Sequence, residues 1–301
     1  MAALNALTFD IEDYFHVSAF QSSVPKTEWN RYESRVERNT SKLLDILGTS
    51  GVHATFFVLG WVAERFPQLV KAIHAAGHEV SCHGYSHEML TQLDPVTFRD
   101  DVRRAKGLLE GLIGCRVLGY RAPSFTVIQE TMWALPILVE EGFAYDSSIV
   151  PIRHDRYGMP HANPLCHRLL TSAGPLWEIP PSTVVICGIR LPIAGGGYFR
   201  LFPYRLSRRR LLKRVERQGV PLVMYMHPWE LDPEQPRIQS SRLSRFRHYV
   251  NLDKTEKRLT QLLKDFRFGS IRETIEPIAQ VMKAVALESS GGKEPNALVR
   301  G

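Results

Sequence analysis

The sequence predicts an α/β fold in which parallel strands are joined by helices. Short apolar, β-branched runs alternate with stretches of helical periodicity along most of the 301 residues. Polar and reactive residues directly follow several of these runs at their carboxyl ends. Because the active site of a (β/α) barrel is built from the carboxyl ends of its strands, both observations favour a barrel.

The composition, 44% hydrophobic and 23% charged, is that of an ordinary globular protein. The sequence contains no run of about 18 uncharged apolar residues and no basic start followed by an apolar signal core. The four cysteines lack C-x-x-C spacing, which favours reduced thiols over a disulfide framework. We therefore expect a cytoplasmic protein.

The net charge of +7 comes largely from two arginine-rich stretches, 205–217 and 242–258. Solvated helix faces explain such stretches best, and attraction to an anionic polymer or to lipid headgroups is the alternative. No nucleic-acid recognition motif accompanies the charge, so we expect no nucleic-acid partner. Peripheral association with the inner face of a membrane stays open as an interpretation.

The first predicted strand, Ala6–Phe9, runs into three acids, Asp10, Glu12 and Asp13. Acids this close repel one another, and a bound cation is the simplest compensation. A solvated turn or the amino end of a helix is the alternative. Residues two apart in an extended strand point the same way, so Asp10 and Glu12 would share a face.

A second strand, Ala54–Gly60, follows a short helix, and the helical stretch Trp61–Ala76 is divided by Pro67. A short strand then leads into His83 and His87. Four residues make about one helical turn, so both imidazoles could face one point. Two such histidines are most often residues on a helix face, but in a zinc hydrolase they join a third ligand, often a carboxylate.

The next helix, Pro95–Ile113, is expected to begin at Asp94 as its N-cap. Two strands follow, separated by a helix over 130–141. The first ends at Arg121 and the second at Asp146. Each places a charged side chain at the edge where the acids and histidines are expected.

The alternation breaks over about 151–205, where we expect a looped insertion over the barrel mouth. A buried strand over 221–230 then carries His227. Helices are expected over 206–217, 255–265 and 274–287, with a short strand at 268–271. Residues 286–301 are small, polar and glycine-rich and are expected to be disordered.

These motifs resemble those of the NodB-homology polysaccharide deacetylases, carbohydrate esterase family four, from about Ala6 to Ile271. Four segments carry the similarity: Thr8–Asp10, His83–His87, Arg121–Phe125 and His227, with Asp146 at the place of a fourth-motif acid. TFDIEDYFHV, ATFFVLGWVAERFP, YDSSIVPIRHDRYG, GGGYFR and HPWELD further resemble the exopolysaccharide deacetylases of exosortase (PEP-CTERM) systems.

The resemblance implies a distorted (β/α)7-type barrel in a single domain, 1–285. It implies metal-dependent removal of acetyl groups, mainly N-acetyl, from an exopolysaccharide or its lipid-linked precursor. Zn²⁺ is the expected metal, and Co²⁺, Ni²⁺ or Fe²⁺ would suit the same ligands. The partner would then be an acetylated glycan.

The resemblance also implies roles for individual residues. Many relatives carry adjacent aspartates in the first motif, whereas here Asp10 and Glu12 are two apart. We therefore expect Glu12, with Asp13 as the alternative, to bind the metal together with His83 and His87. Asp10 is the expected general base, and Arg121 is its expected charge partner. His227 is the expected general acid, and Asp146 is expected to orient it.

Two other functions fit the sequence. The first is hydrolysis of a small-molecule amide on the same scaffold, as in an allantoinase-like or sugar deformylase-like enzyme. The second is sugar binding by a non-catalytic homologue. The presence of every proposed chemical group in order favours catalysis.

Overall fold

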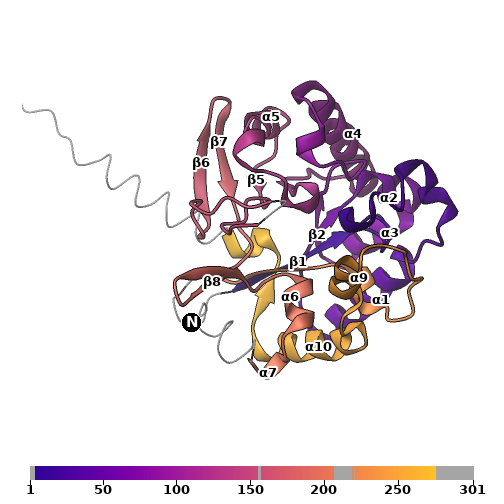
Figure 1. Ribbon diagram of the computed structural model, residues 1–301. Helices are drawn as coiled ribbons and strands as arrows, with labels where there is room; N and C mark the ends of the chain where they lie inside the picture. Colours follow the sequence, from indigo (N-terminus) through magenta and orange to yellow (C-terminus); the bar gives the residue numbers. More distant parts are fainter. Residues whose placement is uncertain (1–3, 155–156, 207–218, 220, 276–301) are drawn as a thin grey trace, which may run out of the picture.

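A parallel β-sheet forms the centre of the molecule, and helices cover its outside (Figure 1). The computed structural model describes residues 4–154, 157–206, 219 and 221–275. The strand order is β10-β1-β2-β3-β4-β5-β7-β6, with β11 paired to β1. The strands are β1 (Asn5–Ile11), β2 (Thr55–Val58), β3 (Glu79–Cys82), β4 (Gly119–Tyr120), β5 (Tyr145–Asp146), β6 (His167–Thr171), β7 (Gly174–Glu178), β10 (Val223–Met226) and β11 (Phe268–Gly269).

All neighbouring strands of this sheet run parallel except β6 and β7, which form an antiparallel hairpin. The chain beyond β7 returns to the opposite edge, where Ser182 N donates to Val223 O at 3.1 Å. Tyr225 N donates to Ala194 O at 2.9 Å, next to a bridge between Gly195 and Tyr225. These contacts join the two edges of the sheet into a barrel-like form.

The helices are α1 (Val36–Ser50), α2 (Gly60–Arg65), α3 (Pro67–Ala75), α4 (Pro95–Ile113), α5 (Ala134–Glu140), α6 (Gly196–Leu201), α7 (Tyr204–Leu206), α9 (Arg242–Tyr249) and α10 (Thr255–Asp265). Short 3₁₀ helices span Ser18–Phe20, Lys26–Arg31, Leu90–Gln92, Pro123–Phe125, Gln129–Thr131, Pro228–Leu231 and Leu252–Lys254. None of the helices in the described ranges is both long and apolar enough to traverse a bilayer.

Local sequence signals account for several of these boundaries. Pro67 begins α3 directly after α2 ends, so the division of the long helical stretch is confirmed. Asp94 caps α4, because its carboxylate accepts hydrogen bonds from Val96 N and Thr97 N, both at 2.9 Å. The expected helices over 206–217 and 274–287, and the expected tail over 286–301, lie almost wholly outside the described residues.

The segment 151–205 has more regular structure than the expected loops. It contains the β6–β7 hairpin, which extends the main sheet, and a separate hairpin of β8 (Thr183–Ile186) and β9 (Ile189–Pro192). Exposed and half-buried residues alternate along β6, as in a strand with one solvated face. Turn-forming residues, which are frequent in this segment, hid these short strands from the sequence analysis.

The two faces of β1 pack against different parts of the protein. Leu7, Phe9 and Ile11 pack in the large apolar core, whereas Ala6 belongs to a second, inner apolar cluster. Side chains alternate along a strand, so Asp10 lies on the face of Ala6. The carboxylate is therefore directed toward the inside of the barrel, near the carboxyl end of the strand.

We expect Gly119→Ala to destabilise the protein by about 1–3 kcal/mol, because a Cβ there overpacks the core. That Cβ would lie 2.1 Å from Tyr145 Cζ. The Tyr145 hydroxyl bonds to Ser81 Oγ at 2.8 Å and to Glu79 Oε1 at 3.0 Å, which holds the ring in place.

Gly107→Ala in the middle of α4 is the matched control, since no atom lies within 4 Å of its Cβ position. It should leave stability unchanged or raise it by about 0.5–1 kcal/mol. Chemical denaturation of both variants measures the difference, and equal stabilities would contradict the packing argument.

Candidate metal centre and active site

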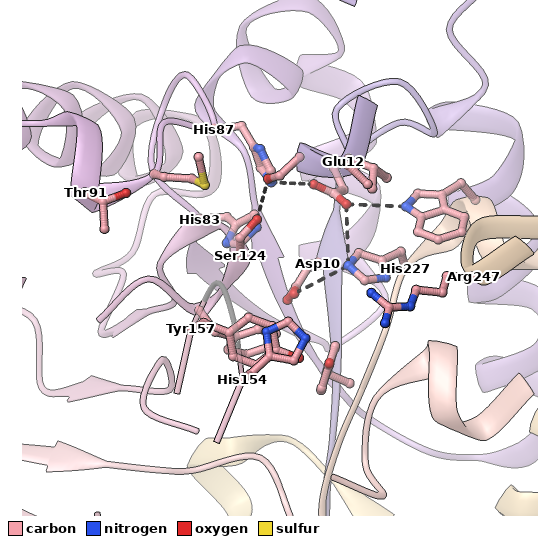
Figure 2. A pocket seen from close by; sticks show the side chains of 17 residues that line it. Asp10, Glu12, His83, His87, Thr91, Ser124, His154, Tyr157, His227 and Arg247 are labelled. Atoms are coloured by element: carbon pink, nitrogen blue, oxygen red, sulfur yellow. Dashed lines mark hydrogen bonds and ion pairs between the residues drawn. The ribbon is translucent and has the colours of Figure 1, made fainter. Parts of the chain in front are cut away.

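A cavity of about 470 Å³ opens where β1, β3, β4 and β10 end (Figure 2). The side chains around it come from segments far apart in the sequence. They are Asp10, Glu12, Val17, Ser18, Ala19, His83, His87, Met89, Thr91, Ser124, Phe125, His154, Tyr157, Tyr225, His227, Trp229 and Arg247. The cavity therefore collects all of the expected site residues except Asp13, Arg121 and Asp146.

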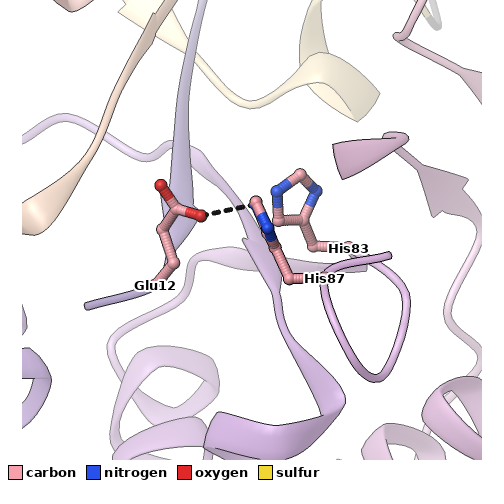
Figure 3. A group of neighbouring side chains, drawn as sticks. All are labelled: Glu12, His83 and His87. Carbon is pink, nitrogen blue, oxygen red and sulfur yellow. Dashed lines mark ion pairs between the residues drawn. The ribbon is translucent and has the colours of Figure 1, made fainter. Parts of the chain in front are cut away.

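Glu12, His83 and His87 form a group that could hold a metal ion (Figure 3). One potential ligand atom from each lies within 4.8 Å of the other two, and all three residues are buried. Glu12 Oε2 is 2.7 Å from His87 Nε2, yet this buried oxygen has no hydrogen-bond partner among the described residues. A cation between the carboxylate and the imidazoles would satisfy it.

The electrostatics of the group suit a cation as well. Burial lowers the pKa of His83 to about 4, against the opposing effect of Asp10, so its imidazole is neutral at pH 7. His83 Nδ1 lies 2.8 Å from Arg121 O; donation there leaves the lone pair of Nε2 for a ligand bond. Burial alone would raise the pKa of Glu12, but His87, then His227 and His83, hold it well below its usual value.

The loop that carries the two histidines is not helical, contrary to the expectation from their spacing. Gly84 has φ +72° and His87 has φ +52°, so the chain turns tightly between them. Asp101 of α4 fixes this turn by accepting hydrogen bonds from Tyr85 N at 2.7 Å and from Ser86 N at 3.2 Å. The two imidazoles are thus brought together by a loop that hydrogen bonds to Asp101 hold in place.

Asp10 is held by Arg121 at the bottom of the site. Arg121 Nη1 donates to Asp10 Oδ1 at 2.6 Å and to Thr8 Oγ1 at 2.9 Å. The buried guanidinium also donates to Ser147 O and to Ser147 Oγ, and it lies 4.1 Å from the centre of the Phe57 ring. The expected pair of Arg121 and Asp10 is present, and both side chains are buried.

His227 lies between the cavity and a second buried ion pair. Its Nε2 is 3.4 Å from Glu12 Oε1 and 3.9 Å from Asp10 Oδ2, while Nδ1 is 2.9 Å from Glu230 Oε1. Glu230 is bound in turn by Arg200 Nε at 2.6 Å. Although burial lowers the pKa of His227, the bond to Glu230 and the charges of Glu12 and Asp10 raise it to about 9.

Asp146 does not orient His227, so this part of the sequence analysis is wrong. Its carboxylate accepts from Ser148 Oγ at 2.5 Å and shares a hydrogen bond with Glu178, the residue opposite it on β7. The carboxylate at His227 Nδ1 belongs to Glu230. The reason is local pairing: Asp146 stands opposite Glu178 in the register of β5 and β7, whereas Glu230 follows His227 by three residues in one turn.

Asp13 is not part of the metal group either. The strand ends at Ile11, and the Asp13 carboxylate turns toward the start of α1. It accepts from Ser34 Oγ at 2.6 Å, Arg35 N at 2.9 Å and Val36 N at 3.2 Å. Burial raises its pKa to about 6, against these hydrogen bonds. Of the two alternatives, the structure thus places Glu12 with the histidines.

Sequence reasoning missed Glu230, Arg200 and Asp101. Glu230 could have been found, because a carboxylate three residues after a strand-end histidine can bond back to it in a tight turn. Arg200 and Asp101 act across long separations in sequence. Their partners were therefore not detectable from spacing.

Comparison with known proteins divides the chain into two segments. Residues 6–135 match the family described as polysaccharide deacetylase, and residues 147–276 match a domain family of unknown function. The first segment thus carries the sequence pattern of the polysaccharide deacetylases, as the resemblance implied, together with Asp10, Glu12, His83, His87 and Arg121. His227, Glu230 and Arg200 lie in the second segment.

Curated relatives match part of this chain. A peptidoglycan deacetylase-like protein of Gibberella zeae is 39% identical over 110 residues, 36% of this chain and 32% of its own length. A peptidoglycan-N-acetylglucosamine deacetylase of Bacillus cereus is 35% identical over 96 residues, 32% of this chain and 35% of its own. The chain therefore spans about a third of the length of these relatives.

A solved structure matches over the whole chain. It is a Mycobacterium smegmatis protein assigned to the polysaccharide deacetylases, with a TM-score of 0.61 and 22% identity, over 100% of this chain and 94% of its own. This likeness shows the fold and confirms the predicted α/β barrel-type architecture.

Metal binding should depend on Glu12, His83 and His87 and not on Asp13. We expect His83→Ala, His87→Ala or Glu12→Ala to weaken Zn²⁺ binding by more than about 100-fold, since losing an outer-shell partner alone costs about 10–100-fold. His74→Ala in α3, an exposed histidine, is the control and should bind as the unchanged protein does. Calorimetric titration of metal-free protein measures the affinities.

Asp13→Ala should keep the Zn²⁺ affinity while lowering the free energy of unfolding by about 0.5–2 kcal/mol, because α1 loses the acceptor at its start. The reverse pattern, with Asp13→Ala losing the metal and Glu12→Ala keeping it, would contradict the ligand assignment.

The buried pair of Asp146 and Glu178 should make stability depend on pH. Burial raises the pKa of both carboxyls, and each has the other as its hydrogen-bond partner, so the folded pair keeps a proton above the range of free carboxyls. Because the folded state binds more protons than the unfolded chain, the stability contributed by the pair is complete at low pH. It is lost as pH rises through the folded pKa.

Glu178→Gln keeps a donor for Asp146 at every pH, so it should flatten this dependence. Denaturation from about pH 4, near the pKa of free carboxyls, up to about pH 8 compares the variant with the unchanged protein. An identical pH profile in both would show that the pair holds no such proton.

Proposed function

We propose that this protein is a metal-dependent deacetylase that removes acetyl groups, mainly N-acetyl, from a bacterial exopolysaccharide or its lipid-linked precursor. The observation that carries the proposal is the position of Glu12, His83 and His87 beside Asp10 and a protonated His227 in one cavity. A set of metal ligands, a general base and a general acid are the three requirements of amide hydrolysis by an activated water.

The ligand group fits a divalent ion such as Zn²⁺, which when bound would polarise the acetyl carbonyl and lower the pKa of water. Asp10 then serves as general base and takes the proton of the attacking water. Its Oδ1 is occupied by Arg121, which leaves Oδ2 toward His227 and the cavity. The hydrogen bond from Arg121 also fixes the orientation of the Asp10 carboxylate.

Breaking the C–N bond needs a proton on the leaving amine, and His227 Nε2 is the donor. Glu230 holds Nδ1, which fixes the ring and favours the imidazolium, and Arg200 holds Glu230. Trp229 stacks on the imidazole with ring centres 5.0 Å apart. Asp10 and His227 are thus a base and an acid with opposite resting charges, as the reaction requires.

The subgroup assignment is part of the proposal. GGGYFR and HPWELD, which resemble exopolysaccharide deacetylases of exosortase systems, contain Arg200 and Glu230. These residues support His227 in place of the fourth-motif acid. A glycan partner, a cytoplasmic location and work at the inner face of the membrane are proposed with it.

A small-molecule amide is the less favoured substrate because the cavity is not closed. His154 and Tyr157 stack with ring centres 4.1 Å apart at its rim, and both also line a neighbouring hollow of about 520 Å³. Aromatic rims suit extended sugars. A non-catalytic role is disfavoured by the completeness of the chemical groups.

Acetate release from acetylated oligosaccharides tests the proposal directly. We expect release that stops after chelation and returns with Zn²⁺, and no turnover of allantoin or formylated sugars. Turnover of only the small amides, or undiminished release after the metal is stripped, would contradict it.

His227→Ala should reduce amide hydrolysis by about 10²-fold or more, the usual contribution of a general acid, and spare 4-nitrophenyl acetate, whose leaving group needs no proton. Glu230→Gln should also reduce amide hydrolysis more than ester hydrolysis, but by less, because Glu230 orients His227 and favours its protonated form. The exposed Glu234→Gln is the matched control. Equal losses on amide and ester in both variants would remove His227 as proton donor.

A further inference from the structure

An exposed apolar surface lies where the end of α6 meets α9. Large apolar side chains are usually covered, yet Leu201 is 42%, Phe202 36%, Leu243 57% and Phe246 55% exposed. The two helices pack against each other and lie side by side in Figure 1. A clustered set of this kind marks a binding surface more often than scattered single residues do.

The arrangement on α9 makes this surface continuous. Leu243, Phe246, Arg247 and Val250 follow the spacing of one helix face. Phe246, Arg247 and Val250 line a hollow of about 340 Å³ together with Leu201 and other residues of α6. The apolar side of α9 is therefore only partly covered by α6.

The same helix is strongly cationic. Arg242, Arg245 and Arg247 are exposed, and α9 contains no acidic residue. Within the part of the chain that the structure describes, none of the three forms an ion pair. Nearby, the Arg237 guanidinium lies over the Tyr249 ring at 4.2 Å. Unpaired guanidiniums beside exposed apolar side chains are complementary to phosphate groups above an apolar layer.

The surface adjoins the catalytic cavity. Arg247 lines the cavity, as Figure 2 shows, and it also lines the hollow beside α6. Tyr157 and His154 likewise belong to both. A large partner bound on α9 would therefore lie next to the mouth of the cavity.

We propose that α9 and the end of α6 form a docking surface for an anionic lipid bilayer. The arginines bind lipid phosphates, and Phe202, Leu243 and Phe246 enter the headgroup boundary. An acidic polysaccharide would match the arginines but not the exposed apolar side chains. The link to a lipid-borne glycan rests on the proposed function, whereas the lipid contact itself does not.

Co-sedimentation with vesicles tests this surface. The probes are phosphatidylcholine alone and phosphatidylcholine mixed equally with phosphatidylglycerol, and the protein should bind only the mixture. Arg242→Gln with Arg245→Gln should lower the partition coefficient by about 10- to 30-fold, given the usual attraction per basic residue. Phe202→Ser with Leu243→Ser should also lower it, because apolar insertion is lost.

Arg168→Gln with Leu170→Ser is the matched control. It removes an exposed arginine and an apolar side chain, Leu170, that is 87% exposed, but both lie on β6, away from α9. Deacetylation of a soluble acetylated oligosaccharide should be unchanged in all of these variants, which shows that they are folded. Absence of binding to the mixed vesicles, or equal losses in the control and the α9 variants, would overturn the docking surface. If the unchanged protein binds the mixed vesicles but does not deacetylate the soluble oligosaccharide, the proposed function is overturned and the docking surface is not.

Discussion

The burial of two carboxylates at the end of one strand is the constraint on which the rest of the site depends. Asp10 and Glu12 are both almost fully buried, and an isolated buried charge is costly. Arg121 compensates Asp10, and three histidines surround Glu12. Glu12 Oε2 lies 2.7 Å from His87 Nε2 without a well-formed hydrogen bond, so its compensation by the protein is incomplete. The proposed metal ion would supply the missing positive charge.

The barrel brings the two matched segments of the chain to this point. β10 pairs with β1 in a register that sets Phe9 opposite Met226, so the next residues along each strand are Asp10 and His227. Asp10, the proposed base, and His227, the proposed acid, are therefore neighbours because of strand pairing across more than 200 residues. Arg200, also from the second segment, donates to Glu230, which in turn holds the imidazole of His227. The second matched segment thus places His227 beside Asp10 of the segment with the deacetylase pattern.

Much of this could be predicted from the sequence, because it depends on short-range rules. Period-two alternation placed Asp10 with Glu12, and strand ends marked His83, Arg121 and His227. The errors arose where long-range pairing decides. Its place in a motif suggests that Asp146 orients His227, but its neighbour in the sheet is Glu178, and Glu230 holds the imidazole instead. The histidine loop was misjudged because Asp101, far along the chain, fixes a turn that the spacing alone does not specify.

The central claim is that one carboxylate and two imidazoles, drawn from separate strand ends, hold a catalytic cation. Crystals of Zn²⁺-loaded protein, measured on both sides of the zinc absorption edge, test it most directly. The account predicts a single anomalous peak within coordinating distance of Glu12, His83 and His87. A peak held by Asp13 or outside the cavity, or a cavity without any peak in zinc-saturated crystals, would contradict it.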